Sequence, residues 1–229
     1  MEGTPTNVDA KKQVDELWEA IAQTANQHFK HSMPERILKL STLLKSDDFS
    51  LRAGQVGQEP RLEEDETAAP PSKRARVEGS KGAVPVNKAL ARVVPAIKEE
   101  ILAVIDIFNS VKIWIQLSIP RIEAGNTFGV DIQTDTISEL SRAEDAAYSL
   151  LEGITKYYVT RGKLISKVLK HPEIEDYSLS VVELDEKEYL NMRLSTLDLR
   201  NNMAIIYDLL SKNWDRIQKP TSSHHTTMF

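Results

Sequence analysis

The sequence of 229 residues contains no cysteine, and only 6% of its residues are aromatic. The absence of cysteine excludes disulfide bonds, thiolate metal sites and cysteine nucleophiles, and it is typical of a reducing compartment. Glycine (9 residues) and proline (10 residues) are too few for a fibrous or a fully disordered chain. With 41% hydrophobic and 28% charged residues, the composition is that of a globular protein with a sizeable core.

The sequence also shows no pattern of a secretory signal or of a membrane-spanning segment. The first ten residues carry neither a basic nor an apolar run, so we expect no secretory signal. The most apolar stretch, residues 101–119, is interrupted by polar side chains such as Asp106 and Lys112, which argues against a membrane span. The net charge of −5 argues against an overall attraction to nucleic acid or to anionic lipid. We therefore expect a cytosolic or nuclear protein that binds neither membranes nor nucleic acid.

Motifs for catalysis are also missing. The sequence has no HExxH or Glu-x-x-His pattern around its five histidines, no GxSxG elbow, and no phosphate-binding loop followed by Lys-Ser or Lys-Thr. The histidines are His28, His31, His171, His224 and His225. We therefore predict that the chain is not an enzyme and binds no metal and no cofactor. A di-metal bundle enzyme is the alternative that stoichiometric bound iron or manganese would support.

What the sequence does contain is helical periodicity in four long stretches. Apolar residues recur at spacings of three and four in residues 8–44, 87–123, from about 130 to 170, and from about 181 to 217. The pattern predicts an all-α fold, an elongated antiparallel four-helix bundle. Residues 1–45 would form the first helix, bent at Pro34, and residues 87–220 the other three. Residues 173–180 would connect the last two helices, and residues 221–229 would form a flexible C-terminal tail.

Helix order has a geometric consequence. In an up-down-up-down bundle the N-terminus, the connection between the second and third helices, and the C-terminal tail share one end, and the connection after the first helix lies at the other. The second and fourth helices carry apolar residues on more than one side, which indicates additional partners. Side-by-side self-association is therefore expected, and a closed ring is a normal result of head-to-tail contacts.

A second distinctive region is residues 46–86, predicted to be a mobile charged loop. It contains four of the nine glycines, four of the ten prolines and few apolar residues. A short basic cluster, Lys73, Arg74 and Arg76, follows two prolines, a form that import receptors recognise. We expect this cluster to direct the protein to the nucleus. A fraction of the protein in the cytoplasm would be compatible with this expectation. The alternatives are a solvated charge run or a weak contact with nucleic acid.

The most informative segment is residues 119–130, Ile-Pro-Arg-Ile-Glu-Ala-Gly-Asn-Thr-Phe-Gly-Val. Its glycines and asparagine allow positive φ, so we expect a tight, shaped loop, although an ordinary turn between helices would fit too. The segment resembles the activation loop of the 11S (REG) proteasome activators, PRIEDGNNFGV. Residues 112–117, 156–161, 183–189 and 199–201 are similar to that family in the same order. Residues 157–164 and the basic cluster make the chain most similar to the nuclear gamma type.

The resemblance implies a homo-heptameric ring that docks on the α-ring of the 20S proteasome and promotes hydrolysis of peptide or protein substrates without ATP. It assigns docking to the C-terminal residues Thr227, Met228 and Phe229, and import-receptor binding to the basic cluster. It assigns gate opening to the activation loop, here Arg121, Ile122, Glu123, Ala124, Gly125, Asn126, Thr127, Phe128 and Gly129. Ala124 and Thr127 replace the family's usual Asp and second Asn. The alternative is a nuclear helical scaffold ring that activates no protease.

Overall fold

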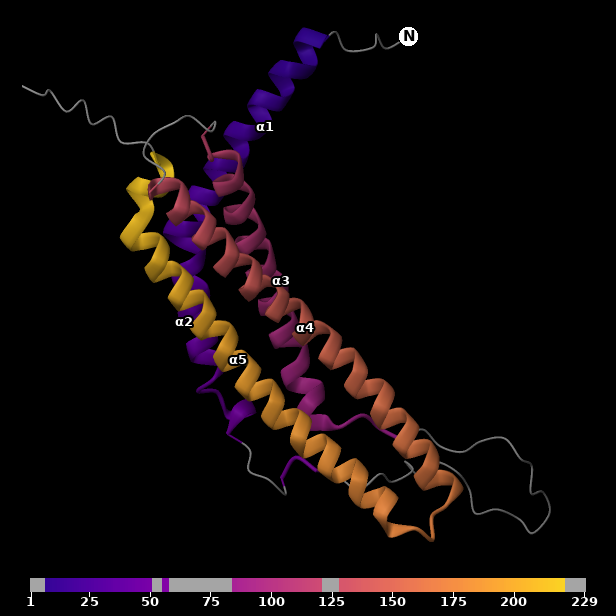
Figure 1. The fold of residues 1–229 in the computed structure, drawn as a ribbon. Helices are drawn as coiled ribbons and strands as arrows, with labels where there is room; N and C mark the ends of the chain where they lie inside the picture. Colours follow the sequence, from indigo (N-terminus) through magenta and orange to yellow (C-terminus); the bar gives the residue numbers. More distant parts are fainter. Residues whose placement is uncertain (1–6, 51–54, 58–83, 121–127, 221–229) are drawn as a thin grey trace, which may run out of the picture. The chain divides into compact units, whose positions relative to one another are not determined.

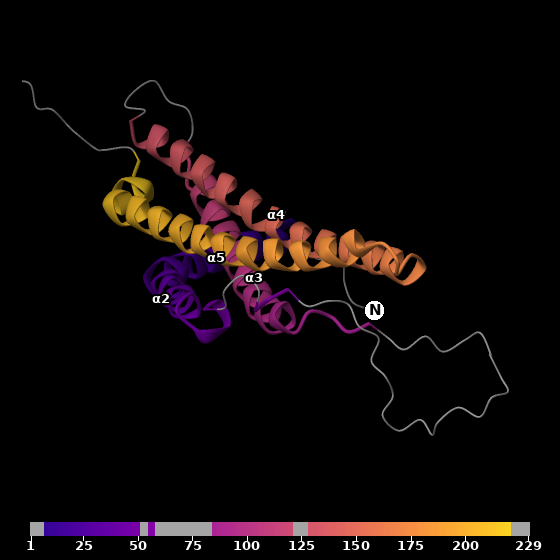
Figure 2. The ribbon, with the colours of Figure 1, turned by 90° about the horizontal axis from the view of Figure 1, so that it is seen from below.

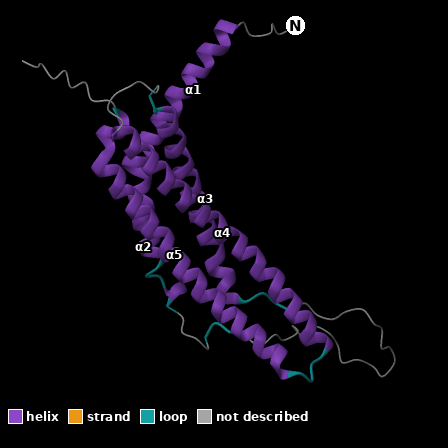
Figure 3. Cartoon of the chain, in the orientation of Figure 1, coloured by secondary structure: helices purple, strands orange, loops and turns teal. Residues whose placement is uncertain are grey.

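The computed structural model describes residues 7–50, 55–57, 84–120 and 128–220. All secondary structure in these ranges is helical (Figure 3), which confirms the predicted all-α fold. The chain divides into two compact units. Unit 1 comprises Met1–Thr42, Glu99–Leu151 and Thr196–Phe229, and unit 2 comprises Leu43–Lys98 and Glu152–Ser195. Three long helices, α3, α4 and α5, each contribute one part to each unit.

The first predicted helix is present, but a wider turn interrupts it. It consists of α1 (Asn7–Gln27), a π-helical turn (His28–Ser32) and α2 (Met33–Leu43). Ala25, Phe29, Met33 and Ile37 follow one another at a spacing of four, and over these three steps an ideal α-helix would drift by about 120°. The π turn, closed by a hydrogen bond from the Met33 N–H to the His28 carbonyl, offsets that drift. It lies just before Pro34, where we had expected a bend.

The helix α3 (Lys88–Leu117) begins where the sequence predicts. Asn87 is its N-cap, because the Asn87 Oδ1 accepts hydrogen bonds from the Ala89 and Leu90 amides at 3.0 and 3.1 Å. The helix ends at Leu117 rather than at the predicted Glu123. Pro120 explains the early end, since a proline disfavours helical torsion angles in the residue before it.

The two longest helices, α4 (Phe128–Lys170) and α5 (Glu175–Gln218), lie side by side in both ribbon views (Figures 1 and 2). The helix α4 ends at Lys170, as the apolar spacing predicts, and Pro172 follows it. The predicted connection 173–180 is wrong, however, because α5 begins already at Glu175. Glu175 and Asp176 lie in its first turn, where the positive end of the helix dipole stabilises acidic side chains.

An aromatic stack and ion pairs join the helices of unit 1. The Trp214 ring of α5 stacks on Phe29 from the π turn, with centroids 4.0 Å apart, and on Trp114 from α3 at 4.9 Å. Arg36 of α2 donates to the buried Glu100 carboxylate of α3 at 2.9 Å. These contacts hold α2, α3 and the second part of α5 together.

The outer part of α1 contrasts with this core. Every residue from Asp9 to Ala20 is exposed. An apolar stripe on this part consists of Val14, Leu17 and Trp18, whose exposed fractions are 44%, 56% and 52%. Further along the same face, Ala25 is fully buried. The described residues of the chain thus leave the outer half of the α1 stripe largely uncovered.

Unit 2 includes residues from the predicted loop 46–86. A short 3-10 helix (Asp47–Phe49) and Val56 both pack inward, with Phe49 4% and Val56 1% exposed. The Tyr189 hydroxyl of α5 donates to the Asp48 carbonyl at 2.6 Å. The described ends of the predicted loop are therefore held against α5, whereas residues 51–54 and 58–83, including the basic cluster Lys73, Arg74 and Arg76, lie outside the described residues.

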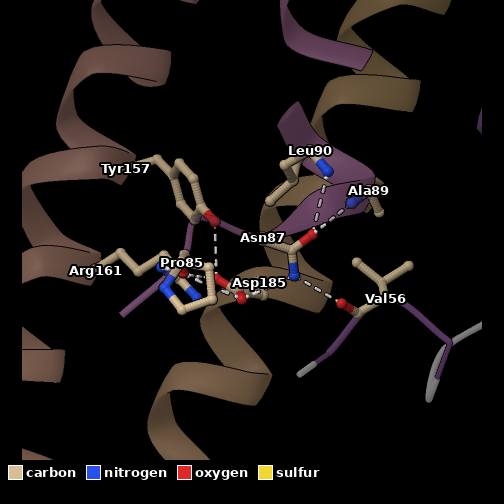
Figure 4. A network of polar contacts seen from close by, with 8 residues as sticks. All are labelled: Val56, Pro85, Asn87, Ala89, Leu90, Tyr157, Arg161 and Asp185. Atoms are coloured by element: carbon tan, nitrogen blue, oxygen red, sulfur yellow. Dashed lines mark hydrogen bonds and ion pairs between the residues drawn. The ribbon is translucent and has the colours of Figure 1, made fainter. Parts of the chain in front are cut away.

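A buried carboxylate organises unit 2 (Figure 4). Asp185 of α5 is fully buried and accepts hydrogen bonds from Arg161 Nε at 2.9 Å, from the Tyr157 hydroxyl at 2.8 Å and from Asn87 Nδ2 at 2.8 Å. Burial, followed by the hydrogen bond to Asp185, raises the pKa of Tyr157 above its ordinary value, so the phenol stays a donor. One carboxylate thus joins α3, α4 and α5.

The same network reaches the backbone on both sides of residues 58–83. Asn87 Nδ2 also donates to the Val56 carbonyl at 2.7 Å, and Arg161 Nη1 donates to the Pro85 carbonyl at 3.2 Å (Figure 4). Val56 and Pro85 are therefore held at one place in unit 2. Among the residues that the structure describes, no helix is long and apolar enough to cross a membrane.

Candidate functional site

Three helix ends meet at the end of unit 1 where the predicted activation loop and tail leave the described chain. They are the last turn of α3, the first turn of α4 and the last turn of α5. The α3 end is tightened because the Ser118 amide bonds to the Trp114 and Ile115 carbonyls, each at 3.0 Å, and its hydroxyl bonds to the Trp114 carbonyl at 2.8 Å. A helix end leaves its last carbonyls without partners, so such a place needs donors from elsewhere.

Gln133 of α4 supplies those donors. Its side chain is fully buried, and its Nε2 donates to the Ser118 carbonyl at 3.3 Å and to the Ile217 carbonyl at 2.8 Å. Ser118 directly follows α3, and Ile217 lies in the last turn of α5, so neither carbonyl has an intrahelical donor among the described residues. One side-chain amide therefore caps two helices and joins their ends.

Gly129 brings the α4 and α5 ends into closer contact. A Cβ atom at Gly129 would lie 2.2 Å from the Pro220 carbonyl oxygen and 2.5 Å from its Cα. These are backbone atoms, so a side chain at this position would push the end of α5 away. The sequence allows positive φ at the glycines of this segment, but Gly129 is a helical residue of α4, where the missing side chain permits the close approach to Pro220.

The aromatic stack of unit 1 lies close to this end. Trp114 precedes Ser118 by one helical turn, and Trp214 precedes Ile217 by nearly one turn. Their rings are 4.9 Å apart with an interplanar angle of 29°. The ends of α3 and α5 are thus joined twice, once by stacked indoles and once by the Gln133 amide.

The contacts at this end of unit 1 are structural, and most of the groups that make them are uncharged. Its contacts are made by backbone carbonyls, a neutral amide and aromatic rings, and the first turn of α4 carries one acidic residue, Asp131. Within the described ranges, no cluster of His, Asp and Glu residues is arranged to hold a metal ion. The arrangement joins two chain segments through neutral contacts.

The structure describes only part of the predicted site. Phe128 begins α4 and Gly129 contacts Pro220. The remaining loop residues, Arg121, Ile122, Glu123, Ala124, Gly125, Asn126 and Thr127, lie outside the described residues. The tail residues Thr227, Met228 and Phe229 also lie outside them.

Sequence reasoning missed Gln133, although a signal was present. Buried positions on α4 recur at Gly129, Gln133, Thr136, Leu140 and Ala147, at helical spacing. Gln133 and Thr136 are polar residues within this stripe. A polar residue at a buried position needs a hydrogen-bond partner, which points to a specific contact.

Comparison with known proteins gives consistent results. The family model of the N-terminal part of the proteasome activator PA28 matches residues 8–58, and the model of its C-terminal part matches residues 83–227. The human proteasome activator complex subunit 3 is 35% identical over 245 residues, with 96% of each chain covered. Proteasome activator 28 of Dictyostelium discoideum is 30% identical, covering 98% of this chain and 97% of the relative.

Solved structures agree with these matches. The crystal structure of the 11S subunit of the Plasmodium falciparum proteasome, PA28, has a TM-score of 0.78 and 31% identity, covering 97% of this chain and 98% of that one. A structure of an archaebacterial 20S proteasome–PA26 complex contains a similar chain, with a TM-score of 0.68, 13% identity, and coverage of 93% and 99%. The last likeness concerns the fold alone. Together the comparisons confirm the resemblance predicted from residues 119–130.

Proposed function

The chain belongs to the PA28 family of proteasome activators, and from this premise we propose that it activates the 20S proteasome without using ATP. The protein would regulate a protease and contribute no catalytic group. Its substrates would be those of the proteasome, peptides and loosely folded proteins. The absence of a phosphate-binding motif in the sequence supports a mechanism in which binding alone drives activation.

One observation carries the proposal: the end of unit 1 holds the helix ends from which residues 121–127 and 221–229 continue. Gln133 hydrogen-bonds to the ends of α3 and α5, and Gly129 contacts Pro220. If a docking segment and a gating segment act on the same partner surface, the helix ends that carry them must be held close together. The activation loop around Asn126 and the docking tail ending at Phe229 would share it.

Assembly into a homo-heptamer would supply the affinity. A single tail of a few residues binds weakly, whereas several tails on one ring bind together, since each further contact is intramolecular. The terminal carboxylate of Phe229 would pair with a basic group between proteasome α subunits. The bound ring would then stabilise the open gate, a shift between pre-existing states.

The nuclear address is a further part of the proposal. Lys73, Arg74 and Arg76 would bind an import receptor as extended side chains. Val56 and Pro85, on either side of the segment that carries them, are both held by the buried network of unit 2. A fluorescent fusion in which the three basic residues are replaced by alanine should lose its nuclear accumulation, and an unchanged distribution would remove this part of the proposal.

The test of the main proposal is hydrolysis of a fluorogenic peptide by latent 20S proteasome, without ATP. We expect the wild-type protein to stimulate hydrolysis, and a variant that lacks Met228 and Phe229 to lose both binding and stimulation. An Asn126→Tyr variant should still bind and stay assembled, measured by native mass spectrometry, but should stimulate little. This pair separates docking from gating.

Stimulation by the wild-type protein with a matched proteasome is the decisive result. Its absence would contradict the proposal and favour a helical scaffold ring. Equal stimulation by the wild-type protein and by Asn126→Tyr would mean that the protein is an activator, but that residues other than Asn126 open the gate.

A further inference from the structure

Gln133 is the buried polar residue of unit 1 that links three helices through the backbone. Its Nε2 reaches a carbonyl after α3, 15 residues earlier, and one in α5, 84 residues later. Both partners are acceptors, so the amide must present its NH₂ group to them, which fixes its orientation. Its Oε1 is buried and has no donor among the described residues.

This arrangement is poorly suited to stability alone. A buried amide with an unsatisfied acceptor is costlier than an apolar side chain of the same size, and the neighbouring buried stripe positions of α4 include apolar Leu140 and Ala143. What the glutamine adds is a directed connection between two backbone ends. Ser118 precedes residues 121–127 by two described residues, and Ile217 precedes the tail by three.

We propose that Gln133 is a positioning residue that couples the end of α5 to the end of α3, so that docking of the tail sets the position of the activation loop. This inference rests on the proposed function. A ring docked by its tails fixes the end of α5. The Gln133 amide and the Gly129–Pro220 contact transmit that position to the end of α3, so that the loop meets the gate in one alignment.

The variants that test this role are Gln133→Met and Gln133→Glu. Methionine keeps the length of the side chain but donates no hydrogen bond. An ionised glutamate has the same shape, yet it only accepts hydrogen bonds and places a negative charge at two helix C-termini, where the dipole disfavours it. We expect the glutamate variant to be the more impaired.

Thr136→Val is the matched control. Thr136 is also fully buried and lies one turn further along α4, but its hydroxyl donates only to the Ile132 carbonyl of the same helix at 2.7 Å. The control therefore removes a buried hydrogen bond that lies within α4 and involves no backbone atom of α3 or α5.

The first measurement separates docking from gating. Binding of each variant ring to 20S proteasome is measured by surface plasmon resonance, and peptide hydrolysis is measured at saturating ring concentration. For Gln133→Met we expect stimulation at saturation to fall roughly fivefold or more, the low end of usual coupling factors, with little change in affinity. Thr136→Val should stimulate like the wild type.

The second measurement needs no proteasome. Hydrogen exchange of the intact ring should be faster at the Ser118 and Lys219 amides in Gln133→Met and unchanged there in Thr136→Val. Both amides close the last turns of their helices, on Trp114 and Asp215 respectively.

The outcomes are distinct. If Gln133→Met lowers only thermal stability or affinity, with full stimulation at saturation, the residue is structural and the inference is wrong. Unchanged exchange at both helix ends would also overturn it, even for a variant too unstable to assay. A wild-type ring that does not stimulate would instead contradict the proposed function, and the exchange data would still decide whether Gln133 holds the two ends together.

Discussion

Each unit contains a fully buried polar side chain that joins helix ends or helices, Gln133 in unit 1 and Asp185 in unit 2, and these two anchors are built differently. In unit 1 the neutral amide of Gln133 donates to two backbone carbonyls, and its oxygen has no donor within the part of the chain that the structure describes. In unit 2 the Asp185 carboxylate accepts from a guanidinium, a phenol and an amide. Leaving a buried charge without its partner costs more free energy than leaving one atom of a neutral amide without a hydrogen bond.

The difference in charge between the two anchors indicates which of them can change its hydrogen bonds at the lower free-energy cost. Separating Asp185 from Arg161 would leave an unpaired charge in the interior, so the unit 2 anchor holds one arrangement. Shifting the carbonyls held by Gln133 costs only neutral hydrogen bonds, each worth about 1 kcal/mol net. The adjustable anchor lies at the end to which the proposal assigns docking and gating. The rigid anchor holds Val56 and Pro85 on both sides of residues 58–83.

The largest effect is expected from Arg161→Met. Removing one partner of a buried ion pair leaves the other charge uncompensated, so the free energy of unfolding should fall by about 3–5 kcal/mol. Urea denaturation followed by circular dichroism measures this. Arg142→Met on the same helix is the control, because its pair with Glu139 is exposed and should contribute at most about 1 kcal/mol. Equal losses in the two variants would contradict the rigid character of the Asp185 anchor.

A smaller loss is expected from Tyr157→Phe. The change removes one neutral donor from Asp185 and leaves Arg161 and Asn87 in place, so stability should fall by about 1.5–3 kcal/mol, as for a hydrogen bond to a charged group. The same denaturation experiment checks it. A loss as large as that of Arg161→Met would mean that the phenol, and not the ion pair, dominates the network.

Gly129→Ala should separate stability from function in unit 1. Alanine is favoured over glycine in a helix by about 1 kcal/mol, which offsets part of the strain of displacing Pro220, so stability should change little. Stimulation of the 20S proteasome should nevertheless fall several-fold, because the end of α5 is displaced. The control is Gly153→Ala, where a Cβ meets no atom within 4 Å. Full stimulation by Gly129→Ala would show that the position of Pro220 is irrelevant to activation.

The smallest effect is an opposite response of the units to acid. Burial, partly opposed by Asp106, lowers the pKa of His28 below its ordinary 6.5, so the unfolded chain binds the proton first and unit 1 loses stability as the pH falls below 6.5. Burial raises the pKa of Glu188 above its ordinary 4.5, with Asn191 and Lys187 opposing. The folded chain then binds the proton first, and unit 2 gains stability as the pH falls through that raised pKa.

Hydrogen exchange at pH 7 and pH 4.5, corrected for the intrinsic rate, measures this response in each unit. His28→Gln should remove the loss in unit 1, and Glu188→Gln should remove the gain in unit 2. A response of the same sign in both units, unchanged in the variants, would assign it to other groups.

The helices could be predicted from the sequence because the spacing of apolar residues that indicates a helix lies within that helix. Spacing of apolar residues placed all four long helical stretches. The early start of α5 was missed because a connection was assigned to residues 173–180, although no residue there prevents a helix. The π turn left a trace in the four-residue spacing from Ala25 to Ile37, which the sequence reading treated as ordinary periodicity.

The anchors could not be predicted in the same way. Asp185 and Asn87 are 98 residues apart, and Gln133 and Ile217 are 84 residues apart, so no window of the sequence contains both partners. The activation loop was identified by resemblance, and its residues 121–127 lie outside the described structure. The sequence therefore predicts the loop, while the support beneath it follows only from the packing of α3, α4 and α5.

The π turn His28–Ser32 also determines the direction in which a distant surface faces. An ordinary α-helix with the same number of residues would rotate everything before it by about 120°. The apolar stripe of Val14, Leu17 and Trp18 lies about three turns away and would then face another direction. Deleting one residue while restoring the α-helix would instead leave the stripe within about 20° of its present direction. The wide turn and its extra residue thus compensate each other, and changing only one of them would redirect a surface without changing any residue in it.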